Sequence, residues 1–218
     1  MAVKVGLKYI DIWGESMEDA IANYEKEVQE PGQIVFYGPS YFTRWSTRHG
    51  MIPLREAIKG ESGEPCIVNR GFGSSCAEHQ LYFYPRAVRP LAPSALVYCC
   101  HANGGAFGYS LEESWELGQR VVAYAMTDFP GIHIYLCSVG PRFKDYSITE
   151  NANNARFNSA LKRFCEDNPN CHYIDIMKYE GMHRKDIFVE DGVHFNQEGY
   201  HEYTKLFKEE LKEELKRF

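Results

Sequence analysis

Several features that would assign a chain to a specialised class are missing from this sequence of 218 residues. It has no run of about 18 uncharged apolar residues, the length that a membrane-spanning helix needs. No long apolar stretch precedes Asp11, so a secretory leader is not indicated. The formal net charge is −6 without a long basic run, which argues against a surface for nucleic acid or anionic membranes. We therefore expect a cytoplasmic protein whose partner is a small molecule.

Cysteine is present but forms no recognisable pattern. The seven cysteines are an odd number, most lie in apolar runs, and none forms a Cys-x-x-Cys pair. We therefore expect buried reduced thiols rather than a disulfide framework or a zinc site. The chain also has no Walker A motif and no Gly-x-Gly-x-x-Gly after its first predicted strand. Nucleotide binding of those kinds is not expected, and we predict no cofactor.

The composition is otherwise that of an ordinary globular protein, with 44% hydrophobic and 25% charged residues. Fifteen tyrosines and 13 phenylalanines suit an aromatic core, and also a cleft that stacks on flat or sugar-like ligands. The length fits one large or two small domains. Because no linker, repeat or low-complexity segment divides the chain, we expect a single domain over residues 1–218. The sequence does not indicate an oligomeric state.

Short apolar runs alternate with helical patterns along the chain. Strands are predicted at residues 34–37, 66–69, 95–100, 132–137 and 172–176. Helices are predicted at residues 16–28, 51–59, 77–84, 111–126 and 151–165, followed by a last helix that runs to about Lys216. Ser16 is a suitable cap for the first helix. The alternation implies right-handed crossovers, so we predict an α/β fold, a three-layer sandwich with a five-stranded parallel sheet.

Ser40 stands at the end of the first predicted strand. Four apolar or aromatic residues, 34–37, are followed by Gly38 and Pro39, a break that ends the strand and presents the serine. In open α/β sheets ligands bind just beyond the carboxyl ends of the strands. Ser40 is therefore a candidate nucleophile, although an ordinary turn residue or a helix N-cap fits the same position.

Asp191 and His194 lie three residues apart in a predicted turn before the last helix. Their side chains can project the same way, so that Asp191 accepts from one imidazole nitrogen while the other faces Ser40. A serine hydrolase needs such a base and carboxylate, and donors for the oxyanion. Alternatively, Asp191 is a turn residue before Gly192, and His194 is a partly buried core histidine.

The parallel sheet would bring the polar loops to one edge. These loops carry Ser40, residues 71–75, Asn103 and residues 191–194. Asn103 can donate its amide to an oxyanion, with backbone N–H groups of the other loops as companions. A left-handed turn residue before Gly104 is the alternative for Asn103. Because these polar loops meet at one edge of the sheet, a shared catalytic site is favoured over a set of unrelated turn residues.

Two competing sites are less well supported by the sequence. His194, Glu198 and His201 superficially resemble metal ligands, but the two histidines are about two helical turns apart and no further ligand follows. We therefore predict no metal. Cys99 or Cys100 beside His101 suggests a thiol nucleophile, yet both lie in a buried strand pattern, where cysteine is usually inert.

Four blocks of the sequence resemble the SGNH hydrolases, also called GDSL esterases and lipases, over roughly residues 11–211. The blocks are residues 34–40, 69–74, 97–104 and 191–194. The resemblance implies a flavodoxin-like sheet and a metal-independent serine esterase. In that enzyme Ser40 is the nucleophile, His194 is the base and Asp191 is the carboxylate. The resemblance also implies an oxyanion hole built from the backbone N–H groups of Ser40 and Ser74 and the side chain of Asn103.

Four positions depart from the pattern of this family. Pro39 stands where the family has aspartate, and Ser74 where it has glycine. His101 and Gly104 replace a glycine and an aspartate near Asn103. No triad member is lost, so we expect a serine esterase that acts on small acyl esters, such as acetyl groups on a carbohydrate. The expected pocket lining includes Tyr41, Gly73 and His101. The competing hypothesis is a noncatalytic protein that keeps the fold and holds a sugar or acyl group.

Overall fold

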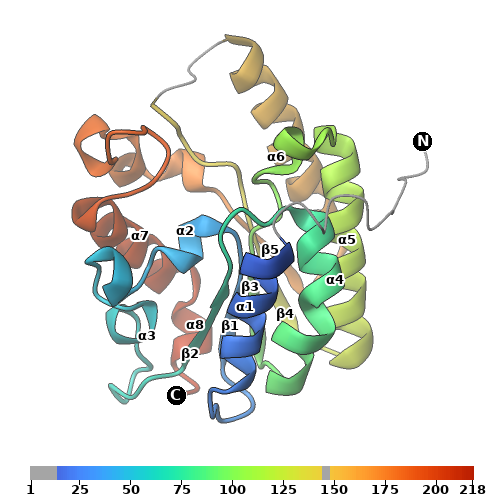
Figure 1. Cartoon of the computed structure of the whole chain (residues 1–218), viewed down its shortest axis with the longest axis vertical. Helices are drawn as coiled ribbons and strands as arrows, with labels where there is room; N and C mark the ends of the chain where they lie inside the picture. The colour runs from blue at the N-terminus through green and yellow to red at the C-terminus, as the bar shows by residue number, and fades with distance from the viewer. Residues whose placement is uncertain (1–13, 144–147) are drawn as a thin grey trace.

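A parallel β-sheet forms the middle layer of the molecule (Figure 1). The computed structural model describes residues 14–143 and 148–218, and within these residues the sheet has five strands. They are β1 (Ile34–Gly38), β2 (Ile67–Gly71), β3 (Ala95–Tyr98), β4 (His133–Cys137) and β5 (Cys171–Ile174). Their order is β2-β1-β3-β4-β5, and every neighbouring pair is parallel. This flavodoxin-like order confirms the predicted α/β class.

Helices cover both faces of the sheet (Figure 1). One face carries α1 (Gly14–Glu25), α4 (Ala77–Ala87), α5 (Leu111–Asp128) and α6 (Ile148–Asp167). The other carries α2 (Ser40–Thr43), α3 (Leu54–Ala57), α7 (Gln197–Glu210) and α8 (Lys212–Leu215). The 3-10 segments are η2 (Thr47–His49), η3 (Arg89–Leu91), η4 (Gly104–Phe107), η5 (Ile176–Lys178), η6 (Glu180–His183) and η7 (Lys185–Ile187). Among the described residues, no helix combines the length and apolar character needed to cross a membrane.

The central strand β1 contributes to the core on both sides. All five of its residues are buried, as the apolar run predicts. Val35 and Tyr37 belong to the cluster beneath α1, α4, α5 and α6, while Ile34 and Phe36 belong to the cluster beneath α7. Successive side chains of a strand point to opposite faces, so one short segment fills two cores.

The helix α7 closes the second face with aromatic side chains. The Phe207 ring lies 4.9 Å from that of Phe36, centroid to centroid, and 4.8 Å from that of Tyr203. The expected single helix is interrupted at Leu211, after which α8 continues. Beyond this interruption the buried carboxylate of Glu214 lies 2.6 Å from His133 Nδ1.

Two predicted helices differ from those observed. The helix expected at residues 51–59 is only the single turn α3, because it starts after Pro53 and stops where Ile58 becomes extended. The predicted cap Ser16 is wrong, since α1 begins at Gly14 and Ser16 is its third residue. In both cases the observed helix boundary differs from the one that the apolar spacing indicates.

We predict that Phe207→Ala destabilises the fold strongly. The side chain is fully buried against Phe36, Phe42 and Trp45, so truncation leaves a cavity under the sheet. The expected loss in the free energy of unfolding is about 3–5 kcal/mol, measured by urea denaturation. Phe207→Leu should lose less because it refills part of the space. Equal losses for both variants would contradict the packing argument.

Candidate active site

Ser40 lies at the carboxyl edge of the sheet, where β1 turns into α2. A Cβ on Gly38 would lie 3.0 Å from the Cβ of Cys99, so the close approach of β1 to the segment after β3 favours glycine. Pro39 lacks an N–H group, but the turn uses only its carbonyl, which accepts the Phe42 N–H at 3.0 Å. The departure from the family pattern at this position therefore breaks no backbone hydrogen bond of the turn.

Asn69 of β2 fixes the position of α2. Its amide nitrogen donates to the Phe42 carbonyl at 2.8 Å, and its amide oxygen accepts the Gly71 N–H at 2.9 Å. A Cβ on Gly71 would be only 2.5 Å from the Thr43 nitrogen, so the two segments pack in close contact. Asn69 was not predicted as a site residue. The signal that points to it is a polar side chain inside an apolar strand, since such a group needs a partner.

Asp191 and His194 lie in a closed loop before α7. The Oδ1 atom of Asp191 accepts the backbone N–H groups of Val193 and His194, both at 2.8 Å. Gly192 has a left-handed backbone with φ of 66°. The loop is closed by the Val189 N–H, which donates to the His194 carbonyl at 2.8 Å. These bonds hold the carboxylate beside the imidazole.

Ser40, His194 and Asp191 form a continuous chain of hydrogen bonds. His194 Nε2 lies 2.9 Å from Ser40 Oγ, and His194 Nδ1 lies 2.7 Å from Asp191 Oδ2. If Nδ1 donates to Asp191, then Nε2 carries the lone pair that accepts the serine hydroxyl proton. The fold thus brings together residues from near the two ends of the described chain.

The carboxyl group of Asp191 is held in its ionised form. Burial raises its pKa, but hydrogen bonds from the backbone and ring of His194 and from the Val193 backbone outweigh burial. The net effect lowers the pKa from 3.8 to about 2. An ionised carboxylate here stabilises positive charge on the His194 ring. The arrangement therefore suits general-base chemistry at neutral pH.

The predicted oxyanion donors Ser74 and Asn103 lie in the loops after β2 and β3. Asn103 Nδ2 donates to the Ser75 carbonyl at 2.9 Å, which joins the two loops. Its second amide hydrogen remains for an oxyanion. Ser74 and Asn103 have left-handed backbones, with φ of 60° and 63°. For Ser74, which follows the half-buried Gly73, this conformation costs roughly 1–2 kcal/mol and explains why glycine suits the position.

Tyr41 and His101 form a buried wall beside the triad. The Tyr41 ring centroid is 6.1 Å from those of both His194 and His101. Burial and, to a smaller extent, Arg142 lower the pKa of His101 to about 3, so its ring is neutral. The Arg142 side chain also hydrogen-bonds to Tyr41. Arg142 was not predicted, because nothing in its local sequence distinguishes one arginine in the loop after β4.

The competing metal and thiol sites gain no support from the geometry. Both ring nitrogens of His194 are hydrogen-bonded, to Ser40 and Asp191. Within residues 14–143 and 148–218, no group of three or more His, Cys, Asp or Glu side chains is arranged to hold a metal ion. Burial raises the pKa of Cys99 to about 12, so its thiol stays protonated and unreactive.

A hydrogen-bonded serine, histidine and aspartate at the carboxyl edge of a parallel sheet is an arrangement typical of serine hydrolases. Residues 37–202 match the GDSL-like Lipase/Acylhydrolase family. Because this match covers most of the chain, the chain belongs to that family and is a carboxylic ester hydrolase. The resemblance seen in the sequence is thereby confirmed.

Several solved structures share the fold of this chain at low sequence identity. A structure provisionally named a platelet activating factor from Streptococcus pneumonia is 19% identical, with a TM-score of 0.74 over 96% of this chain and 97% of that one. A GDSL-like lipase from Bacteroides thetaiotaomicron is 18% identical, with a TM-score of 0.68 over 91% and 98%. The acetyl xylan esterase AlAXEase is 17% identical, with a TM-score of 0.66 over 81% and 98%. No curated protein matches the chain in sequence.

We predict that Asp191 stabilises the fold in a pH-dependent way. Because folding lowers its pKa from 3.8 to about 2, the stabilisation is present above about pH 4 and is lost as the pH falls towards 2. The difference in the free energy of unfolding between wild type and Asp191→Asn should therefore shrink over that interval. Denaturant unfolding at several pH values measures it, with the exposed Asp19→Asn as control. An equal difference at neutral and acidic pH would contradict the prediction.

Proposed function

We propose that the chain is a serine esterase that hydrolyses small acyl esters through Ser40, His194 and Asp191. The observation that carries the proposal is the unbroken chain of hydrogen bonds, 2.9 Å from Ser40 to His194 and 2.7 Å from His194 to Asp191. A protein that only held a sugar or an acyl group would gain nothing from this alignment. The geometry therefore favours catalysis over noncatalytic binding.

The first half of the proposed reaction acylates the serine. Ser40 Oγ attacks the ester carbonyl while His194 Nε2 takes the hydroxyl proton, and Asp191 stabilises the resulting imidazolium. The tetrahedral oxyanion accepts hydrogen bonds from the Asn103 amide and from the backbone N–H groups of Ser40 and Ser74. His194 then gives the proton to the leaving alcohol, which departs and leaves an acyl-enzyme.

The second half uses water in place of the alcohol. His194 takes a proton from the water as it attacks the acyl-enzyme, and the same donors stabilise the second oxyanion. Return of the proton to Ser40 Oγ releases the carboxylic acid. Each step requires only the residues described above, which supports a metal-independent reaction.

A short acyl group fits the wall beside the serine best. Tyr41 and His101 are 8% and 9% exposed, and Tyr41 is packed against Phe195 at 5.7 Å between ring centroids. Such packed side chains leave little freedom to admit a long chain next to Ser40. The acetyl xylan esterase among the structural neighbours also supports acetyl esters, although its likeness shows the fold alone.

We predict that Ser40→Ala and His194→Ala abolish hydrolysis of p-nitrophenyl acetate. Each variant removes a group that moves the proton or forms the acyl bond, so kcat/KM should fall by at least about a thousandfold. The exposed Ser159→Ala and His183→Ala are matched controls. A fluorophosphonate should label Ser40 in the wild type and in both controls, but should label neither Ser40→Ala nor His194→Ala. Equal rates in all five proteins, or labelling that survives Ser40→Ala, would reject the proposal.

We predict that Asn103→Asp lowers kcat by roughly a hundredfold to a thousandfold with little change in KM. Aspartate keeps the shape and tolerates the left-handed backbone, but it cannot donate to an oxyanion when ionised. Steady-state kinetics with p-nitrophenyl acetate tests this. Since Asn103 also donates to Ser75, unfolding must be checked by circular dichroism. A folded variant with wild-type kcat would remove Asn103 from the oxyanion hole.

A further inference from the structure

Gln80 is a fully buried glutamine in the first turn of α4. Its backbone N–H donates to the Cys76 carbonyl at 3.1 Å, so the backbone of this turn is closed. The sequence indicates only a helical residue at this position. In the structure, however, Gln80 makes hydrogen bonds to three segments that lead into the proposed active site.

The side-chain nitrogen of Gln80 joins two of these segments. Its Nε2 atom donates to Ser75 Oγ at 3.3 Å and to the Cys99 carbonyl at 3.2 Å. An amide nitrogen carries two hydrogens, so both bonds can form at once. Because a carbonyl oxygen can only accept, the contact with Cys99 requires the nitrogen end of the amide on this side. Ser75 follows β2 and Cys99 follows β3, the two strands that flank β1.

The backbone of Gln80 makes the third bond, to β1 itself. The Tyr37 hydroxyl donates to the Gln80 carbonyl at 2.6 Å. Burial raises the pKa of Tyr37 well above its usual value, so the hydroxyl keeps its proton and remains a donor. Tyr37 lies in β1, three positions before the proposed nucleophile. One residue of α4 therefore contacts the strand or loop behind each of Ser40, Ser74 and Asn103.

Ser75 is the point at which these bonds meet the proposed oxyanion hole. Its hydroxyl accepts from Gln80, and its carbonyl accepts from Asn103 Nδ2 at 2.9 Å. The carbonyl thereby takes one amide hydrogen of Asn103 and fixes the direction of the other. A displaced Ser75 would turn that second hydrogen away from the oxyanion. Ser75 is fully buried, so Gln80 can hold it without competition from solvent.

The side-chain oxygen of Gln80 indicates that packing alone does not account for this residue. The Oε1 atom is buried and accepts no hydrogen bond from any described residue. A buried acceptor without a donor lowers stability, and an apolar side chain of the same length would avoid that cost. The fold therefore keeps an amide here against its own stability. Such local violations are expected where a residue serves function.

We propose that Gln80 is a positioning residue for the oxyanion hole and acts through Ser75 on the amide of Asn103. The inference rests on the proposed function, in which Asn103 donates to the oxyanion. Such donors stabilise the oxyanion only when they are already aimed at the place where charge develops. A displacement of about 1 Å can lower a rate roughly a hundredfold, so a residue behind the donors can matter without touching substrate.

Gln80→Met is the main test variant, because methionine has a similar length and shape but no N–H group. Ser75→Ala removes only the hydroxyl that accepts from Gln80, and it serves as the second variant if Gln80→Met does not fold. Near-ultraviolet circular dichroism checks the fold of both.

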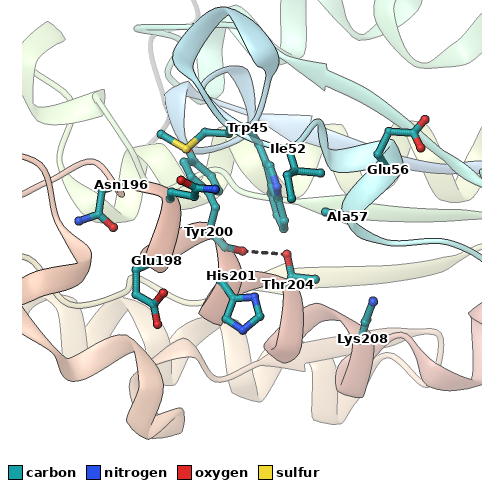
Figure 2. Close-up of a pocket in the computed structure, with 12 residues that line it drawn as sticks. Trp45, Ile52, Glu56, Ala57, Asn196, Glu198, Tyr200, His201, Thr204 and Lys208 are labelled. Atoms are coloured by element: carbon teal, nitrogen blue, oxygen red, sulfur yellow. Dashed lines mark hydrogen bonds between the residues drawn. The ribbon is translucent and has the colours of Figure 1, made fainter.

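Thr204→Val is the matched control, because it also exchanges a hydrogen-bonding side chain for an apolar one of similar shape. Thr204 Oγ1 donates to the Tyr200 carbonyl at 2.8 Å (Figure 2). Both residues line a cavity of about 710 Å³ beside α7, whose lining does not include Ser75, Gln80 or Asn103.

The kinetic test uses p-nitrophenyl acetate. The value of kcat should fall roughly tenfold or more in Gln80→Met and roughly threefold or more in Ser75→Ala, with KM unchanged, while Thr204→Val keeps the wild-type kcat. In the Asn103→Asp background, Gln80→Met should have little further effect, because the two residues act as one unit. A wild-type kcat in either variant, or single effects that multiply fully in the double variant, would overturn the inference.

An NMR measurement separates failure of this inference from failure of the proposed function. The side-chain amide resonances of Asn103 are identified by their absence in Asn103→Asp. They should shift in Gln80→Met and Ser75→Ala and stay in place in Thr204→Val. Unshifted resonances overturn the positioning role even if no ester is hydrolysed. If the resonances shift but hydrolysis survives Ser40→Ala, the proposed esterase mechanism fails while the positioning of Asn103 stands.

Discussion

The parallel pairing of β1 between β2 and β3 is the constraint on which the site depends. In this register Gly38 pairs with Gly71, and Tyr37 pairs with both Arg70 and Tyr98, so the three strands end at nearly the same level. The loops that carry Ser40, Ser74 and Asn103 therefore begin side by side. A shift by one residue would exchange the side chains that β1 gives to the two cores and misplace the serine.

Strong local patterns allowed much of the fold to be predicted from the sequence. Each of the five strands is a short and mainly apolar run, and alternation with helices permits few topologies other than a parallel sheet. The placement of Ser40 followed from the Gly38-Pro39 break, and the pairing of Asp191 with His194 followed from their spacing. The expected role of Asn103 followed from the convergence of the loops, and the resemblance to a known family then supplied the expected role of Ser74.

Features that depend on contacts between distant segments could not be predicted in this way. Asn69 donates a hydrogen bond to Phe42, 27 positions away. The sequence around Asn69 indicates only that a polar group lies in an apolar strand. Arg142 reaches Tyr41 from another loop. The cavity beside α7 is bounded by residues between Trp45 and Ala57 on one side and by residues between Asn196 and Lys208 on the other. No periodicity of either segment encodes that space.

The long separation in sequence between the proposed nucleophile and the proposed base has a consequence for how the site arises during synthesis. Ser40 and His194 are 154 positions apart, so a ribosome completes β1 to β5 before the histidine is made. The loop of Asp191 and His194 is then held in place by α7, which packs on Phe36 through Phe207. An unfinished chain thus carries a serine with no base beside it. In the proposed mechanism, hydrolysis becomes possible only when the last helices dock onto the sheet.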